Sequence, residues 1–371
     1  MLYKIKTITS IDELVSMEQH INIINSLSNN ATIFCDLQWL INWWNLYSQV
    51  EDSLNIPVIY KHDHPVAFAP FYLKNNQTIM WIGTGGKEDA EVCPEYLDVI
   101  KIQKFEEEFA INILKSWLTN NNSKIKELFL IHCLKESIIS KVLSSFKINY
   151  VTHISPTGVQ HYIELAQGVA EYINTLKSSS FSKKLTKLNR LIETDESIHI
   201  KYIDNTSMEF TSYFNKLSQL HTERWERQGK PGAFTSDVFK EHHLNVYRKT
   251  RNKKKQILCV ILLNNEVIGV SYCLLSKSFC HYYQSGIVDT SPHKYSPGHL
   301  LHVAMMRYCQ IENIPRYDFM RGKVSGSYKD LYSATTKEMV NIQSYKSSMS
   351  TLPNVAMTIA RNVKQNHKKI A

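Results

Sequence analysis

The chain has 371 residues, of which 43% are hydrophobic and 21% are charged, and its formal net charge is +9. These values are ordinary for a globular protein that folds without metals or disulfides, and they exclude a small disulfide-stapled scaffold. With ~150 residues per domain, we expect two or so domains.

Cysteine usage and hydropathy indicate a cytoplasmic protein. The seven cysteines are scattered, include no CxxC pair and lie mostly in apolar strings such as QILCVILL around Cys259. We therefore expect reduced, buried thiols and neither a disulfide framework nor a zinc site. The N-terminus meets Asp12 and Glu13 early, so we expect no signal peptide. The apolar run at 257–263 is far short of the ~18 residues of a membrane helix.

Basic residues cluster in three stretches, which are KSSSFSKKLTKLNR (177–190), YRKTRNKKK (247–255) and the tail ARNVKQNHKKIA. Such clusters are either solvated faces or contacts for an anionic partner. Coenzyme A phosphates, tRNA, a nucleotide-sugar and an acidic glycan are the candidate anions. DNA is not an expected partner.

Apolar spacing predicts the elements of the first half. In chain order these are a strand at 1–8, helices in 10–30 and 34–48, strands at 55–61, 66–74, 78–83 and 95–101, a helix at 105–118, a strand at 126–133 and a helix at 136–146.

The second half repeats this outline and predicts a mixed α/β fold. The expected elements are a strand at 159–165, helices near 168–177 and 180–193, a strand at 198–203, helices near 206–228 and 236–249, strands at 256–264, 266–277 and 278–289, a helix at 299–313, a strand at 316–320, a helix and a final strand near 339–346. Asn264–Asn265 predicts a hairpin turn. A helix that follows the last strand of an antiparallel meander favours ligand binding at their junction.

The stretch YYQSGIVDTSPHKYSPGHLLHVAMMRY (282–308) contains the best candidate for an anion site. Its SPG leads into a helix, whose first turn carries unpaired amides and a partial positive charge. Gly298 allows close approach of the backbone, and Ser296 can cap the helix or donate to phosphate. The amides of Ser296 to His299 therefore suit the pyrophosphate of coenzyme A. An ordinary helix start is the alternative interpretation.

The stretch RYDFMRGKVSGSYKDLY (316–332) places Asp318 at the end of an apolar strand. This carboxylate can accept a proton or orient a substrate, or it can pair with Arg321 and hold the strand end. Tyr328 and Lys329 follow on a Gly/Ser loop, where Tyr328 can protonate a departing thiolate.

The stretch QLHTERWERQGKPGAF (219–234) places His221 and Trp225 on one helix face, since they are four residues apart. His221 is either a general base or a partly buried structural histidine. The loop RQGKPGAF is a candidate lining of the acceptor pocket.

Two further histidine pairs, His62 with His64 and His242 with His243, have no third partner at metal-ligand spacing. We expect both pairs at the surface and no metal site. GTGGK (83–87) is too short and wrongly spaced for a P-loop.

Together these stretches resemble the GNAT-like acyltransferases grouped with the CelD/BcsL cellulose-biosynthesis acetyltransferases, which are distant relatives of the Fem-type aminoacyltransferases. The resemblance covers nearly the whole chain. It is carried by FCDLQWLINWWNLY, WIG…EYLDVI, FSKKLTKLNR, LHTERWERQGKPGAF, VIGVSYCLLSKSFCHYYQSG, YSPGHLL and YDFMRG…YK in the same order.

The resemblance implies two GNAT folds in tandem, with a degenerate scaffold half at 1–157 and a transferase half at 158–371. It implies acetyl-CoA or another acyl-CoA as donor, and an amine or hydroxyl of a sugar, a polysaccharide precursor or a related metabolite as acceptor. The residues expected at the site are His221, Asp318 and Tyr328 for catalysis, Gln284, Ser285, Ser296, Gly298 and His299 for the cofactor, and Trp225, Arg321 and Lys329 for the acceptor.

One departure concerns Lys323, which stands where the family tends to have an acidic residue, and VSGS lengthens the gap before the Tyr-Lys pair. This difference allows a different, acidic acceptor. Two alternatives stay open. One is a Fem-like transferase that uses aminoacyl-tRNA, disfavoured because the second half has no long helical-hairpin insertion. The other is a non-catalytic module that recognises a polysaccharide intermediate.

Overall fold

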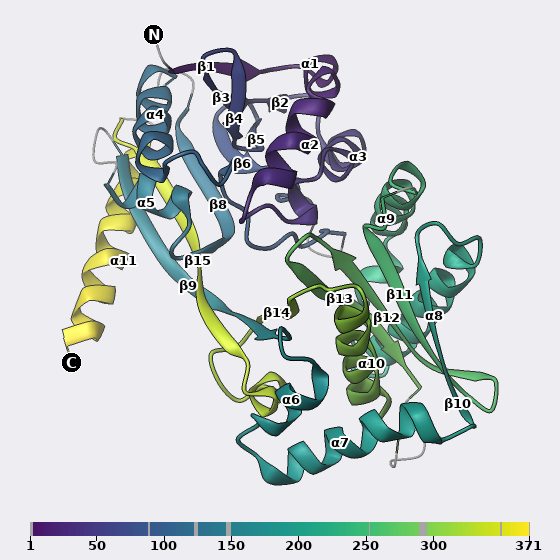
Figure 1. Ribbon diagram of the computed structural model, residues 1–371. Coiled ribbons are helices and arrows are strands. Elements are labelled where there is room, and N and C mark those ends of the chain that lie inside the picture. Colours follow the sequence, from purple (N-terminus) through teal and green to yellow (C-terminus); the bar gives the residue numbers. More distant parts are fainter. Residues whose placement is uncertain are drawn as a thin grey trace. The chain divides into compact units, whose positions relative to one another are not determined.

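A computed structural model describes residues 3–87, 90–121, 125–145, 150–251, 253–288, 295–348 and 351–370, with side chains up to 362 in the last segment (Figure 1). The chain forms two compact units, and the first comprises Met1–Gly86, Val92–Gly158 and Lys337–Ala371. The second comprises Lys87–Glu91 and Val159–Thr336. Within the described ranges, no helix is both long and apolar enough to cross a membrane.

The first unit contains most of the N-terminal elements and the last strand and helix of the chain. Its elements are β1 (Tyr3–Ile8), α1 (Ile11–Ser16), α2 (Glu18–Leu27), η1 (Ile33–Cys35), α3 (Leu37–Tyr47), β2 (Ser53–Leu54), β3 (Ile56–Lys61), β4 (His64–Phe68), β5 (Phe71–Lys74), β6 (Thr78–Trp81), β7 (Ile100–Lys101), α4 (Glu107–Asn120), β8 (Glu127–Leu134), α5 (Ile138–Ser145), the start of β9 (Tyr150–Glu164), β15 (Thr335–Lys346) and α11 (Leu352–Ile370).

The strands of this unit lie in two arrays, ordered β1-β3-β4-β7 and β9-β15-β8-β6-β5-β2. The single strand expected at 66–74 is two strands, because the chain leaves one array after Phe68 and enters the other at Phe71. Pro70 lies at this change, where a residue without an amide proton costs no ladder hydrogen bond.

The C-terminal helix α11 was not expected, since its sequence was interpreted only as a basic tail. Val355 and Thr358 are buried one turn apart on this helix. The structure therefore gives the first part of this helix a buried face.

The second unit contains the elements from the end of β9 onward. They are α6 (Val169–Asn174), α7 (Ser179–Thr194), β10 (Ile198–Asp204), α8 (Phe210–Glu226), η2 (Ala233–Thr235), α9 (Asp237–Lys249), β11 (Gln256–Leu263), β12 (Glu266–Leu275), β13 (Phe279–Ile287), α10 (Pro297–Ile311), β14 (Arg316–Gly322) and η3 (Tyr328–Tyr332).

The sheet of the second unit has the order β10-β11-β12-β13-β14-β9. All its neighbours are antiparallel except β13 and β14. The predicted hairpin turn between β11 and β12 is confirmed, because Asn264 and Asn265 have φ values of 50° and 67°. Such left-handed residues suit a two-residue hairpin, and asparagine tolerates them well.

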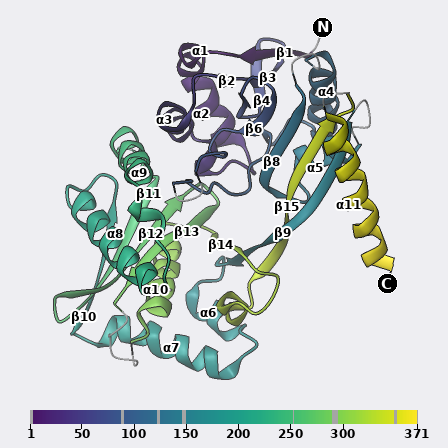
Figure 2. The same cartoon turned by 180° about the vertical axis from the view of Figure 1, so that it is seen from behind.

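Helices cover both faces of this sheet. A Cβ added to Gly269 of β12 would meet Leu301 of α10 at 3.2 Å. A Cβ added to Gly286 of β13 would meet Leu220 of α8 at 2.6 Å. Gly269 pairs with Ile287, the residue after Gly286, and successive residues of a strand face opposite sides of the sheet. Gly269 and Gly286 therefore face opposite sides, and so do the two helices that they contact. Figures 1 and 2 show α10 and α8 from the two sides of the sheet.

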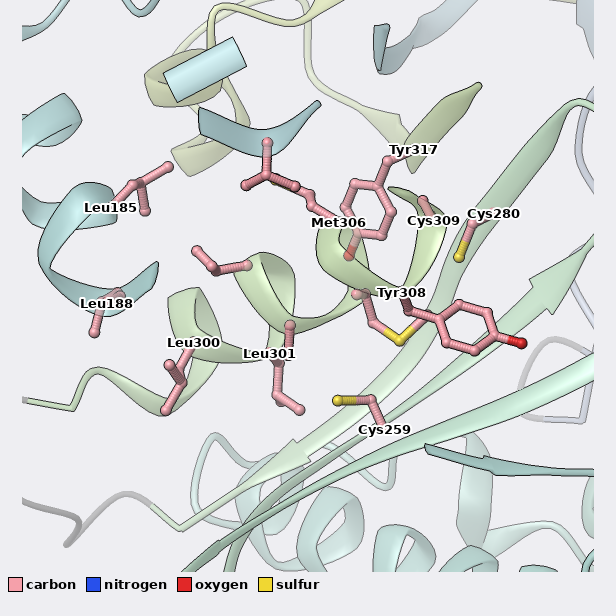
Figure 3. Close-up of a cluster of buried hydrophobic side chains, with 14 of the residues drawn as sticks. Leu185, Leu188, Cys259, Cys280, Leu300, Leu301, Met306, Tyr308, Cys309 and Tyr317 are labelled. Carbon is pink, nitrogen blue, oxygen red and sulfur yellow. The ribbon is translucent and has the colours of Figure 1, made fainter. Parts of the chain in front are cut away.

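The main core of the second unit lies between α7, α10 and the sheet. Figure 3 shows Leu185 and Leu188 of α7 facing α10, and Cys259, Cys280 and Tyr317 approaching from the strands. Leu300, Leu301 and Cys309 of α10 fill the centre and are fully buried. This packing fixes where α10 begins relative to β13.

The histidine pair on α9 does not lie at the surface, so that prediction was wrong. His242 and His243 are fully buried. His243 packs against Phe239 and Tyr272, with ring centroids 4.5 Å and 5.4 Å away. The pair belongs to the aromatic core on the α9 side of the sheet.

Candidate active site

The parallel strands β13 and β14 pair over only three residues and then part. Phe279, Cys280 and His281 pair with Arg316, Tyr317 and Asp318, and no pairing follows although both strands continue. We call the point after His281 and Asp318 the fork. Beyond it, no strand among the described residues lies along the edge of β13 that faced β14.

A β-bulge follows the fork on β13. Cys273 of β12 pairs with Tyr282, but the next residue, Tyr272, pairs with Gln284, so Tyr283 is an extra residue. A bulge places two successive side chains on nearly the same face. Tyr283 and Gln284 thus both face the α8–α9 side, whereas Tyr282 and Ser285 face α10.

Asp318 holds the base of the fork. Its Oδ2 lies 2.8 Å from His281 Nδ1 and accepts a hydrogen bond of 3.2 Å from Gln160 Nε2. Its Oδ1 accepts one of 2.8 Å from the Met320 amide. Asp318 and His281 are both fully buried. This geometry gives Asp318 a structural role in place of the expected direct contact with the acceptor, because a base must reach the proton that it removes.

Lys329 stabilises the bend that follows in β14. Met320 has a left-handed φ of 63°, and the register shifts between Asp318 and Arg321. The Lys329 ammonium donates to the carbonyls of Phe319, Met320 and Arg321 at 2.6, 2.9 and 2.7 Å. A lysine has three protons to donate, so these bonds occupy all of them. Lys329 thus supports the fold where the sequence had predicted contact with the acceptor.

His221 lies on the α8 side of the fork. It is 3% exposed, and its Nε2 accepts a 2.9 Å hydrogen bond from Trp225 Nε1. Burial lowers the pKa of His221 to about 4, against the raising effect of the Gln284 side chain. The Trp225 proton occupies Nε2, so the neutral imidazole carries its own proton on Nδ1, which is buried and has no hydrogen-bond partner among the described residues. His221 therefore has no available lone pair for the acceptor. The general-base interpretation therefore does not fit these contacts.

Tyrosines gather on the α10 side of the fork. Tyr282 packs on His302, with ring centroids 4.3 Å apart, and Tyr328 of η3 lies over the same imidazole at 5.8 Å. Although 46% of Tyr328 is exposed, desolvation raises its pKa to about 12, opposed by the charge of Arg224. Tyr328 is therefore a neutral hydrogen-bond donor at physiological pH.

The first turn of α10 is open. Ser296 is the N-cap with a left-handed φ of 43°, but its side chain makes no capping hydrogen bond. Pro297 follows as the first helical residue, where its missing amide proton costs nothing. A Cβ added to Gly298 would meet no atom of the described residues within 4 Å. The described part of the chain thus leaves the first turn open to a ligand at Gly298.

The His299 side chain points away from that opening. Its Nδ1 lies 2.7 Å from the Tyr332 hydroxyl, and its ring is 5.2 Å from Phe181 of α7. Burial, with the nearby charge of Lys184, lowers its pKa to about 4. Of His299, only the backbone amide remains for a phosphate.

Helix α7 runs beside α10 in the same direction, since Phe181 contacts His299 near one end and Asn189 binds Arg307 toward the other. The starts of both helices therefore lie together. The exposed side chain of Lys184 is close enough to act on His299. The basic stretch 177–190 thus adds positive charge beside the first turn of α10.

The structure brings most of the expected residues of the second half around the fork. Arg321 is half-buried and contributes a carbonyl to Lys329. The sequence did not indicate His281, Gln160 or Arg224. For Arg224, the one available indication of a place at the site was its position three residues after His221 on the same helix. No group of three or more histidine, cysteine or acidic side chains in the described part of the chain is arranged to hold a metal.

Residues 179–330 match the family model described as an acetyltransferase (GNAT) domain. Part of the second unit is therefore similar to a GNAT acetyltransferase domain. The matched residues include α8, the fork and α10, so all three parts of the candidate site lie inside the matched range. No curated protein matches the sequence of the chain.

Solved structures support the fold beyond the GNAT domain. FemX shares 10% identity, with a TM-score of 0.62 over 92% of this chain and 97% of its own. A protein of unknown function from Bacteroides thetaiotaomicron shares 10% identity, with a TM-score of 0.56 over 92% and 100%. L-PGS from Bacillus licheniformis shares 10% identity, with a TM-score of 0.53 over 95% and 96%. The predicted mixed α/β fold is confirmed. The narrower CelD/BcsL assignment stays a prediction.

Proposed function

We propose that this protein is an acyltransferase that moves an acetyl or other acyl group from acyl-CoA to an amine or hydroxyl of a sugar, a polysaccharide precursor or a related metabolite. The observation that carries the proposal is the fork between β13 and β14, with an accessible helix start on α10 in the same unit. A donor with a peptide-like arm and a diphosphate needs both features. The acceptor class rests on the family resemblance alone.

The diphosphate of the donor would bind the first-turn amides of α10, from Ser296 to His299. Backbone amides and the helix dipole favour an anion at this position. Gly298 leaves space for it, and Lys184 adds charge beside it.

The pantetheine arm would pair with the free edge of β13 near Gln284 and Ser285. Its two amides can hydrogen-bond a strand edge as an added strand does. A backbone N–H on this edge would stabilise the oxyanion, a contribution of roughly 3 kcal/mol. The thioester would then lie at the fork between Tyr328 on one side and Trp225 on the other.

In the reaction, the acceptor nitrogen or oxygen attacks the thioester carbonyl carbon and forms a new C–N or C–O bond. The C–S bond breaks, and the coenzyme A thiolate takes a proton, for which Tyr328 is the proposed donor. The proton lost by the acceptor passes to water and returns to Tyr328, so the balance needs no other reactant. Trp225, held by His221, forms the acceptor wall.

Calorimetric titration with acetyl-CoA, followed by a free-thiol assay with amine and hydroxyl acceptors, tests this proposal. We expect saturable binding at a one-to-one ratio and acceptor-dependent release of coenzyme A. A folded protein that binds neither acetyl-CoA nor longer acyl-CoAs would refute it.

Aminoacyl-tRNA is the second candidate donor, and the exposed lysines of α7 favour it because they present positive charge on one helix. This alternative predicts that the protein binds tRNA and transfers an aminoacyl group, and that it does not bind acyl-CoA. The same protein sample can be tested for both donors.

A further inference from the structure

Arg224 is a half-buried cation for which the structure offers no counter-charge. It lies on α8, three residues after His221 and therefore on the same side of the helix. Among the residues that the structure describes, it forms no ion pair. A charge in such a place is costly unless something compensates it, and most half-buried arginines have a partner.

The side chain of Arg224 reaches the reacting end of the site. Gly286 lies against Leu217 and Leu220, and Gln284 acts on His221, so α8 runs antiparallel to β13 and Arg224 comes closest to the fork. The charge of Arg224 lowers the pKa of both Tyr282 and Tyr328, opposing the larger effect of burial on each. Arg224 is therefore near the hydroxyls on the far side of the fork.

Neighbouring contacts hold this part of the site in place. Trp225 is anchored to His221 through its indole N–H, and Lys230 lies 5.6 Å from the centre of the Trp225 ring. Lys230 thus adds a positive charge beside a fixed aromatic wall, and Arg224 is the residue before Trp225 on α8. Glu223 of the same helix points elsewhere, since it is exposed and bonded to Gln219.

We propose that Arg224 binds a carboxylate or phosphate group of the substrate directly beside the carbon that is attacked. The inference rests on the proposed acyl transfer and specifies its substrate class. A guanidinium matches both anions because its planar N–H groups can donate two parallel hydrogen bonds. The anion supplies the counter-charge that Arg224 lacks among the described residues.

Two sources of this anion share the same chemistry. One source is an acceptor that carries the anion, such as an amino acid or a sugar phosphate, and the other is a donor whose acyl chain ends in a carboxylate. Both would place the charged group within reach of α8 when the thioester lies at the fork. Paired substrates that differ only in this group distinguish the sources.

The test measures kcat/KM with the full-length protein in two arms. In the first arm, acetyl-CoA is given with glucosamine 6-phosphate or glucosamine, and with glutamate or its diamide. In the second arm, succinyl-CoA or acetyl-CoA is given with glucosamine. The variants are Arg224→Gln, Arg224→Lys and Arg227→Gln. Arg227→Gln is the matched control, because Arg227 follows Arg224 by three residues and its Nε donates to the Glu223 carbonyl.

We expect the wild type to prefer the anionic member of a pair by about 30-fold or more in at least one arm, as the loss of a charged hydrogen-bonded pair predicts. Arg224→Gln should reduce that preference to about threefold or less, Arg224→Lys should fall between, and Arg227→Gln should match the wild type. Acetyl-CoA affinity should be the same in all four proteins.

Two results would overturn the inference. If acyl-CoA binds but no charge preference is seen in either arm, or if Arg224→Gln keeps the preference, Arg224 does not select an anion and the proposed acyl transfer still stands. If the folded wild type binds no acyl-CoA at all, the proposed function fails and this inference fails with it.

Discussion

The role that we assign to a residue depends on its hydrogen-bond partners, and His221 is the clearest case. Its spacing from Trp225 predicted a shared helix face, which the 2.9 Å hydrogen bond between them confirms. Its candidate role as a base depended on a free nitrogen, which a sequence does not show. The indole proton and the desolvated surroundings give it a positioning role.

Replacing His221 in two ways separates these roles. His221→Gln keeps an acceptor for Trp225 and should stay within about fivefold of wild-type kcat/KM, whereas His221→Ala should lose about tenfold, mainly through acceptor KM, because one hydrogen bond is lost. Since the pKa of His221 is about 4, its neutral form persists above pH 6, and kcat should show no inflection from it up to pH 9. If both variants lost activity alike, with kcat falling by orders of magnitude, His221 would be the base after all.

Asp318 and Lys329 illustrate what sequence spacing could not distinguish. Asp318 was a candidate because it ends an apolar strand, and Lys329 because the family resemblance implied a contact with the acceptor. Their true partners are His281, Gln160 and three successive carbonyls, which come from distant or backbone positions. The start of a helix at Ser-Pro-Gly was predictable from its local sequence, whereas the role of Gly298 in binding the cofactor stays a prediction.

At the scale of elements, strand and helix types in the second half were largely predictable. The apolar run of β11, the Asn-Asn turn and the amphipathic α8 each carry a local pattern. The split between β4 and β5, the length of β9 and the helix α11 were not, because pairing partners far away in the sequence decide them. The fork itself depends on the bend at Met320 in β14, a backbone conformation that no local pattern predicted.

Lys329 should be essential to the bend in β14. Lys329→Met leaves three carbonyls without their charged donor, and we expect the free energy of unfolding to fall by about 3 kcal/mol. Urea denaturation measures this loss. Lys323→Met, at an exposed position nearby, should change it by less than about 0.5 kcal/mol. Equal stability of the two variants would contradict the role given to Lys329.

The free energy of unfolding should depend on pH through Asp98, whose carboxylate binds the start of helix α5 in the first unit. This carboxylate accepts from the amides of Ile138 and Ile139, both at 3.0 Å, and lies at a pocket of about 310 Å³. Burial raises its pKa from 3.8 to about 6, against these hydrogen bonds. A raised carboxyl pKa means that the folded state holds its proton more tightly than the unfolded state. The protonated carboxyl group therefore stabilises the folded state below pH ~4, and this stabilisation is lost as the pH rises through 6.

The comparison of wild type with Asp98→Asn isolates this effect. Between about pH 4 and pH 7, the stability of the wild type relative to the variant should fall by on the order of 3 kcal/mol. Urea midpoints at several pH values provide the measurement. A difference that stays constant or grows with pH would show that the Asp98 pKa is not raised.

At the scale of the whole molecule, the chain combines a second unit that contains the match to a GNAT domain with a first unit that includes the end of the sequence. Residues 337–371 belong with the first unit, whereas the predicted boundary placed them with 158–371. The predicted boundary at 157/158 lies inside β9. Hydrogen-bonded pairing with β14 keeps the end of this strand extended.

The net charge of +9 predicts non-specific binding of nucleic acid as well as of coenzyme A. If three lysines of α7 contact phosphates, tRNA affinity should fall about 40-fold between about 50 and 200 mM salt. Filter binding across this range measures it. Acyl-CoA-dependent turnover should persist at the higher salt concentration. Aminoacyl transfer from charged tRNA, without acyl-CoA turnover, would favour the second candidate donor.

The most direct test of acyl-CoA binding at α10 is calorimetric titration of acetyl-CoA into the wild type, Gly298→Ala and Gly298→Glu. An alanine Cβ meets nothing within 4 Å, so Gly298→Ala should bind within about threefold of the wild type. Gly298→Glu should fold with the same urea midpoint and bind no detectable acetyl-CoA, because its carboxylate occupies the place of the diphosphate. Binding by Gly298→Glu as tight as by the wild type would contradict the account.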